Sequence, residues 1–159
     1  MQLIESANGS APLLVAKVLE CFPGFRDHAD DTLHFYKRAQ ICVGDWNAAL
    51  NLNLKDMDQL TTFADYRVPQ LFRHFGVLQY SNELAALVDA KQELAVNSAE
   101  ERAIRSSTVA AVEYLVEELK QQGASYNAVT TDWYLWQVGE RMELAGQLKP
   151  HHRVRTIFY

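Results

Sequence analysis

Residues 98–123 form the longest uninterrupted helical pattern in this chain of 159 residues. Ser98 can cap its start, Glu101 stands three residues later as the partner in a capping box, and Gly123 provides a stop. Similar signals divide most of the chain into further helices, and strand-like alternation occurs only in residues 153–159. The sequence therefore predicts an all-α fold with one short extended segment near its C-terminus.

The other expected helices follow the same logic of caps and stops. Ser10 can cap a helix that begins at Ala11 and carries proline in its first turn, and Ser81 can cap another. No repeat, low-complexity tract or linker interrupts the pattern, so we expect residues 1–159 to form a single compact helical domain. The expected helices span residues 11–22, 32–50, 60–65, 69–75, 81–94, 98–123 and 128–144.

Composition excludes several classes of protein. The net charge of −5 argues against a protein that grips a nucleic-acid backbone, which needs a broad basic surface. No apolar stretch approaches the roughly 18–20 residues of a membrane span, and the first residues do not resemble a secretion signal. Cys21 and Cys42 stand among apolar residues and are expected in the core, not in a disulfide or metal site. We expect a cytosolic protein without nucleic-acid or membrane partners.

Residues 62–70 could fix a reactive carboxylate. They set Asp65 between a small residue and an aromatic one, beside Arg67 and shortly before a proline. Two plainer interpretations remain open at this point. Asp65 could cap the helix that follows, and Arg67 could simply form an ion pair with it.

A second polar group of residues follows one face of the helix expected at 32–50. Lys37, Gln40, Ile41, Gly44 and Asp45 recur at helical spacing. Such a face could line a pocket, with the glycine allowing a close approach. It could equally be a solvated face with a lysine–aspartate ion pair, and spacing alone favours that alternative.

The C-terminal region supplies two further sets of candidates. Residues 151–155 carry four cationic or hydrogen-bonding groups that suit a phosphate, although a solvated basic tail is the alternative. The adjacent histidines have no partner at a convincing metal-ligand spacing, so no metal is expected. On the preceding helix, Trp136 fits the core, whereas Asp132 and Tyr134 could reach a ligand or make structural hydrogen bonds.

Three long motifs, taken in order, resemble the queuosine salvage protein family. They are Phe-Tyr-Lys-Arg-Ala-Gln at residues 35–40, Phe-Ala-Asp-Tyr-Arg-Val-Pro-Gln at 63–70 and His-His-Arg-x-Arg-Thr-Ile-Phe-Tyr at 151–159. The resemblance covers essentially the whole chain but only the C-terminal half of family members. It implies hydrolysis of the N-glycosidic bond of queuosine 5'-monophosphate, releasing queuine for tRNA modification, without a cofactor. It also implies a fold similar to helix-hairpin-helix DNA glycosylases.

The resemblance also implies roles for individual residues. Asp65 would stabilise positive charge on the ribose and activate water, and Lys37 would either keep that carboxylate ionised or contact the phosphate. His152, Arg153 and Arg155 would bind the phosphate. The remaining substrate contacts are expected from Asp45, Tyr66, Arg67, Asp132, Tyr134 and Trp136.

Two departures from the family pattern accompany this resemblance. Family members are about twice as long, so we expect a homodimer or a second chain to supply the other half. Ala103 stands where the family usually has an acid, which affects one expected substrate contact. The main alternative is a truncated, non-catalytic relative that binds a nucleotide or a partner chain.

Overall fold

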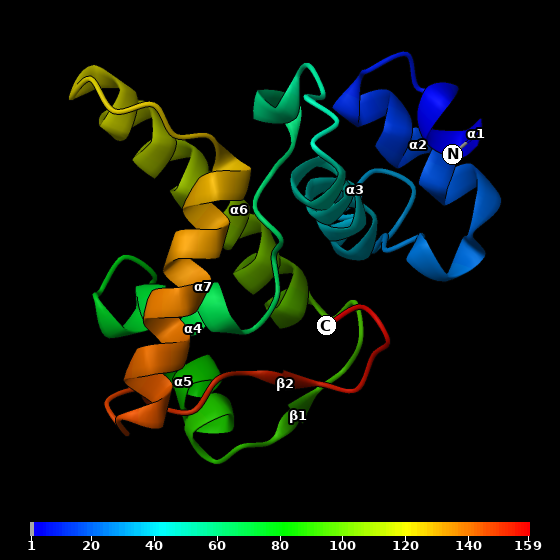
Figure 1. The fold of residues 1–159 in the computed structure, drawn as a ribbon. Coiled ribbons are helices and arrows are strands. Elements are labelled where there is room, and N and C mark those ends of the chain that lie inside the picture. Colours follow the sequence, from blue (N-terminus) through cyan, green and yellow to red (C-terminus); the bar gives the residue numbers. More distant parts are fainter. Residues whose placement is uncertain (1) are drawn as a thin grey trace.

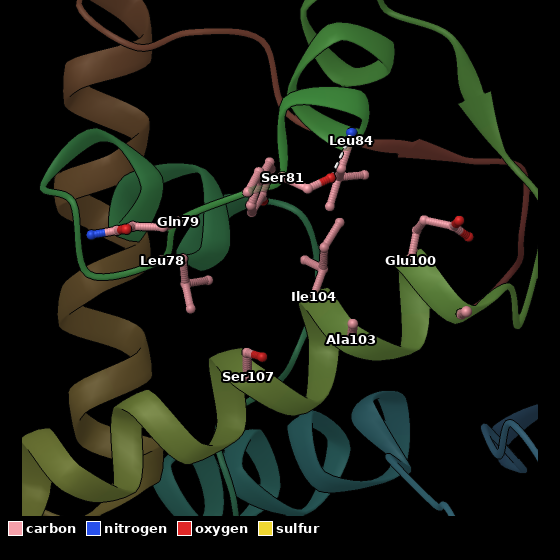
Figure 2. Close-up of a pocket in the computed structure, with 10 residues that line it drawn as sticks. Leu78, Gln79, Ser81, Leu84, Glu100, Ala103, Ile104 and Ser107 are labelled. Atoms are coloured by element: carbon pink, nitrogen blue, oxygen red, sulfur yellow. Dashed lines mark hydrogen bonds between the residues drawn. The ribbon is translucent and has the colours of Figure 1, made fainter.

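Helices make up most of the structure, a computed structural model that describes residues 2–159 (Figure 1). The mainly helical fold predicted from the sequence is confirmed. The helices are α1 (Gln2–Glu5), α2 (Ala11–Cys21), α3 (Lys37–Leu50), α4 (Arg67–His74), α5 (Asn82–Asp89), α6 (Ala99–Gln121) and α7 (Ala128–Leu144), with 3-10 turns at Pro23–Phe25 and Met57–Gln59 and strands β1 (Glu93–Leu94) and β2 (Arg153–Val154).

The predicted helix caps are present. The hydroxyl groups of Ser10, Ser81 and Ser98 each accept a hydrogen bond from a backbone N–H in the first turn of α2, α5 and α6. The capping box at α6 differs in one detail, because the carboxylate of Glu101 accepts the N–H of Asn97 and not that of Ser98. These caps fix where three of the helices begin.

Helix α3 begins at Lys37, so the prediction that residues 32–36 are helical is wrong. The backbone carbonyl of Asp27 accepts the N–H groups of Phe35 and Tyr36, at 3.0 and 2.9 Å. Tyr36 has a φ of 50°, in the left-handed region. A left-handed residue cannot extend a right-handed helix, so α3 starts immediately after it.

Residues 60–65 were also predicted as helical, and they are not. The N–H of Thr61 bonds to Gln40 Oε1 at 2.8 Å, and that of Phe63 bonds to Asp132 Oδ1 at 2.9 Å. Because side chains of α3 and α7 take these donors, the segment does not need helical hydrogen bonds of its own. It therefore crosses the molecule in an extended form.

Helix α5 ends at Asp89 and does not reach residue 94. Lys91 has a φ of 58°, which stops the helix, and Glu93–Leu94 instead forms strand β1. This strand pairs in parallel with β2, which confirms extended structure for residues 153–154.

Two apolar cores hold these elements together. The first lies between α2, α3 and the segment that leads to residue 63, and the second lies between α4, α6 and α7. Figure 1 shows residues 60–65 running from the 3-10 turn at Met57–Gln59 to the start of α4, so they link the elements of the first core to those of the second. The first core contains Ala7, Ala11, Leu14, Val15, Val18, Ala39, Val43, Leu54, Leu60, Phe63 and Val129, and the second contains Val68, Phe72, Val112, Val116 and Ala128.

The C-terminal segment returns from β2 to the junction between the two cores. In Figure 1 it runs from β2 back toward the start of α6 and the side of α3. Tyr159 donates its hydroxyl hydrogen to Glu101 Oε1 at 2.9 Å, and Arg38 bonds to the carbonyl of Ile157 at 3.2 Å. The last residues are therefore held to α3 and α6, although the side chain of Ile157 itself is exposed.

The sequence predicted both cysteines in the core, and neither is fully buried. Cys21 is exposed at the end of α2, so its prediction as a core residue is wrong, and Cys42 is half-buried. Within residues 2–159, no helix combines the length and apolar character needed to cross a membrane.

Candidate functional site

Lys37 and Asp65 meet at the junction between the two cores. Nζ of Lys37 lies 3.4 Å from Oδ2 of Asp65, and the two side chains are only 9% and 10% exposed. Lys37 is the first residue of α3, and Asp65 stands just before α4. Each of these buried charges stabilises the other, because an unpaired charge at a buried position strongly destabilises the folded state.

The geometry shows which of the plainer structural interpretations of these residues hold. Asp65 Oδ1 accepts the backbone N–H of Arg67 at 2.8 Å, so Asp65 caps the start of α4 while its other oxygen faces Lys37. Lys37, Gln40 and Gly44 are buried, so the solvated face with a Lys37–Asp45 ion pair is wrong.

Asp132 of α7 belongs to the same cluster of charges. Its Oδ1 accepts hydrogen bonds from Thr62 Oγ1 and from the N–H of Phe63. Burial raises the pKa of Asp132 to about 6, and the charge of Asp65 adds to this effect, whereas the hydrogen bonds and Lys37 oppose it. The site thus contains one cation, Lys37, and two carboxyl groups, Asp65 and Asp132, that interact electrostatically.

Arg67 faces away from this cluster toward α7. Its Nε lies 2.6 Å from Glu140 Oε1, its Nη1 lies 3.5 Å from Glu143 Oε2, and it also bonds to Gln70. The interpretation in which the Arg67 side chain pairs with Asp65 is therefore wrong. Arg67 holds α4 against α7 immediately beside the site.

Two hollows share Tyr159 as a wall residue. The first, here called the Lys37 hollow, has a volume of about 400 Å³, and its walls include Lys37, Arg38, Asp45, Trp46 and Tyr159. The second, here called the Tyr66 hollow, has a volume of about 340 Å³ and is lined by Tyr66, His151, His152, Arg153, Val154 and Tyr159. Tyr159 lines both, so the hollow with Lys37 and the hollow with Arg153 adjoin at this residue.

His152 is buried and electrically neutral. Burial lowers its pKa to about 3, and the neighbouring charges of His151 and Arg105 act in the same direction. Its Nε2 lies 3.1 Å from the Tyr159 hydroxyl, whose hydrogen is donated to Glu101. Nε2 must therefore donate to the Tyr159 oxygen, so Nδ1 is an unprotonated acceptor. Among the described residues that Nδ1 has no hydrogen-bond partner.

The charge of the Tyr66 hollow therefore comes from other residues. Arg153 is exposed there, and the ring of His151 packs against Tyr66 with centroids 4.5 Å apart. His151 also bonds through Nδ1 to the carbonyl of His152, so the two histidines do not converge on one point. Within residues 2–159, no three His, Cys, Asp or Glu side chains are arranged to hold a metal ion.

Three predicted site residues are not gathered with the others. Tyr134 and Trp136 project from α7 with 62% and 43% of their surface exposed, so placing Trp136 in the core is wrong. Tyr134 lies roughly 200° around the helix from Asp132. Arg155 is exposed and lies outside the walls of both hollows.

Asp27 and Arg105, which are not among the predicted site residues, form a buried ion pair next to the site. Each side chain is only 2% exposed, and Nη1 of Arg105 lies 2.9 Å from Oδ1 of Asp27. A charged residue beside an apolar one, such as Arg105 after Ile104, is an ordinary helix-face pattern. Spacing alone therefore gave no signal that the arginine faces inward.

This chain is similar to proteins of one known family. The model of a family described as "Queuosine salvage protein" matches residues 1–159. Three relatives named queuosine 5'-phosphate N-glycosylase/hydrolase come from Sphaerobacter thermophilus, Dictyostelium discoideum and Bos taurus. They are 42%, 44% and 33% identical to this chain, over 98%, 99% and 100% of its length. The alignments cover 50%, 51% and 51% of those relatives, so this chain spans about half their length.

Proposed function

Because the chain belongs to the queuosine salvage protein family, we propose that its Lys37–Asp65 site takes part in hydrolysing the N-glycosidic bond of queuosine 5'-monophosphate. The observation that carries this proposal is the buried contact of 3.4 Å between Lys37 and Asp65. These are the two residues that the family resemblance assigns to catalysis. The names of the relatives support the same reaction.

In the proposed reaction, Asp65 acts on the ribose. The bond between the anomeric carbon and the base nitrogen breaks, a water oxygen joins that carbon, and the base leaves with a proton. Positive charge develops on the ribose in the transition state. A carboxylate held in a site of low polarity stabilises that charge and can orient the attacking water.

The leaving base needs different help. A 7-deazapurine has carbon where a purine has N7, so protonation at that position is not open to it. We infer that the base occupies the Lys37 hollow, whose aromatic walls, Trp46 and Tyr159, offer apolar surface to a flat ring. The Asp45 carboxylate at the same hollow can accept a hydrogen bond from an N–H group of the base. The positive charge of Lys37 offsets the negative charge that develops on the base.

The 5'-phosphate is assigned to the Tyr66 hollow. Arg153 lies there beside Tyr66 and His151, and an arginine can bind two phosphate oxygens at once. Arg155 is a second exposed cation of the same segment. His152 was also predicted to contact the phosphate. Because its ring is neutral, it adds no positive charge to the phosphate site. We infer that it acts by orienting Tyr159 through the hydrogen bond to the Tyr159 hydroxyl.

Several finer expectations remain predictions. They are the likeness to helix-hairpin-helix glycosylases, the cytosolic location, the single-domain character of residues 1–159, and a homodimer or second chain beside the site.

A direct assay tests the proposal. The purified chain is incubated with queuosine 5'-monophosphate, and free queuine is measured by chromatography, with Asp65→Asn as the matched control. We expect release of queuine by the wild-type chain and release slowed on the order of 10²- to 10³-fold in the variant. Binding of the nucleotide without any release would instead support the non-catalytic alternative.

A further inference from the structure

One residue, Asp27, holds the start of helix α3 with both its backbone and its side chain. Its carbonyl oxygen accepts the N–H groups of Phe35 and Tyr36, and its carboxylate Oδ2 accepts the N–H of Lys37 at 3.3 Å. Three successive N–H groups are thus turned toward a single residue. Tyr36 adopts its left-handed conformation within this arrangement. The direction in which Lys37 leaves the turn is therefore set by Asp27.

Arg105 of α6 connects this turn to the segment that carries Asp65. Two of its nitrogens bond to the two carboxylate oxygens of Asp27, and its Nε donates to the carbonyl of Ala64 at 2.9 Å. Ala64 directly precedes Asp65. One planar guanidinium group therefore fixes the backbone on both sides of the Lys37–Asp65 contact.

The guanidinium group is itself held in place. The ring of Phe35 covers it at 3.9 Å from the centroid, and the ring of Tyr159 lies at 5.2 Å. Glu101 Oε1, on the preceding turn of α6, lies 3.8 Å from Nη1. With two aromatic rings and two carboxylates around it, Arg105 has little freedom to move.

We propose that Asp27 and Arg105 are positioning residues that set the separation between Lys37 and Asp65 in the reaction proposed above, on which this inference rests. Neither side chain lines the Lys37 hollow or the Tyr66 hollow, so they act through the two residues that they hold. Only arginine has enough donors in one plane to bond to Asp27 twice and to Ala64 at the same time.

The first test is Arg105→Lys, which keeps the positive charge but cannot make all three hydrogen bonds. A displacement of about 1 Å at a reacting group can lower the rate on the order of 100-fold. We expect kcat for queuosine 5'-monophosphate to fall by about 10- to 100-fold, with KM within about twofold of wild type. In a crystal structure of the variant, the distance from Lys37 Nζ to Asp65 Oδ2 should exceed 4 Å.

The chain offers a closely matched control. Arg102 lies on the same helix and pairs with Asp30 at 2.7 Å, so it joins the same two parts of the chain, but this pair is about 40% exposed. It has no hydrogen bond to Lys37 or Ala64 within residues 2–159. Arg102→Lys should leave kcat, KM and the Lys37–Asp65 distance unchanged.

The outcomes separate this inference from the proposed function. An Arg105→Lys variant with wild-type kcat, or with an unchanged distance of 3.4 Å, overturns the positioning role. An inactive wild-type chain contradicts the proposed function instead, and the crystallographic distance still decides the positioning role.

A second variant tests the positioning role if Arg105→Lys fails to fold. If Arg105→Lys does not fold, Asp27→Asn/Arg105→Gln removes both charges of the Asp27–Arg105 pair together, and Glu101, which also loses its contact with Arg105, keeps its hydrogen bonds from Tyr159 and Asn97. This double variant should fold and show the same separation of Lys37 from Asp65. A folded double variant with the wild-type distance would overturn the inference.

Discussion

The side chain of Arg67 lies directly against Gly139 of α7. A Cβ atom at position 139 would lie 2.8 Å from Arg67 Cδ and 2.9 Å from Cγ, closer than such atoms can approach. Helix α7 can therefore pass beside the Asp65 segment only because it has no side chain at this point.

Gly139→Ala should consequently destabilise the fold. The added methyl group displaces Arg67 and its pairing with Glu140, and overpacking of this kind costs about 1–3 kcal/mol of unfolding free energy. Urea denaturation measures the loss. Gly24→Ala is the control, because a Cβ there meets no atom within 4 Å, and its effect should stay within about 0.5 kcal/mol. Equal losses for both variants would contradict the close contact.

Asp65→Asn should lower turnover far more than it weakens substrate binding. The variant keeps an oxygen that can accept the Arg67 N–H, but it loses the negative charge that the proposed reaction uses in its transition state. Groups of this kind are worth on the order of 10²- to 10³-fold in kcat. Asp58→Asn, in the exposed turn before the segment, should leave kcat unchanged. Near-normal turnover in Asp65→Asn would mean that Asp65 is only a helix cap.

Arg153→Ala should weaken binding of queuosine 5'-monophosphate more than binding of the unphosphorylated nucleoside. A hydrogen bond to a charged group contributes about 1.5–3 kcal/mol, so the Kd of the nucleotide should rise by roughly 10- to 100-fold. Calorimetry with both ligands measures the difference. Lys120→Ala, at the exposed far end of α6, should change neither Kd. Equal losses for the two ligands would remove Arg153 from the phosphate site.

Asp132→Asn should change how stability depends on pH. The pKa of Asp132 is raised to about 6 in the folded chain from 3.8, so between these values the folded chain binds more protons than the unfolded chain. The contribution of Asp132 to stability is complete below pH 3.8 and is lost as the pH rises through 6. The variant cannot ionise, so its stability relative to wild type should rise by about 2–3 kcal/mol between pH 4 and pH 7.5. Urea denaturation at the two pH values gives this difference, and a constant difference would contradict the raised pKa.

The sequence predicted the parts of the fold that depend on local signals. Serine caps fixed the starts of α2, α5 and α6, because a cap is decided by a few adjacent residues. The segment at 60–65 was mispredicted because distant side chains, Gln40 and Asp132, take its backbone donors. Local propensity contains no information about such partners.

The same distinction applies to the site. Lys37 and Asp65 were predicted as site residues from the family motifs. The spacing of residues alone favoured a solvated helix face for Lys37. Asp27 and Arg105 were missed because their importance lies in contacts between segments far apart in the sequence. Burial of a charged residue becomes visible only when the three-dimensional partners are known.

The contact between Tyr159 and Glu101 has a consequence for the order of folding. These residues are 58 positions apart, and most of α6 and all of α7 lie between them in the chain. Long-range contacts of this kind carry a larger loop-closure entropy and form late. The wall shared by the two hollows would then be among the last parts of the molecule to assemble. The Asp27–Arg105 contact spans 78 positions, so the Lys37–Asp65 pair that it positions should reach its final separation at a similarly late stage.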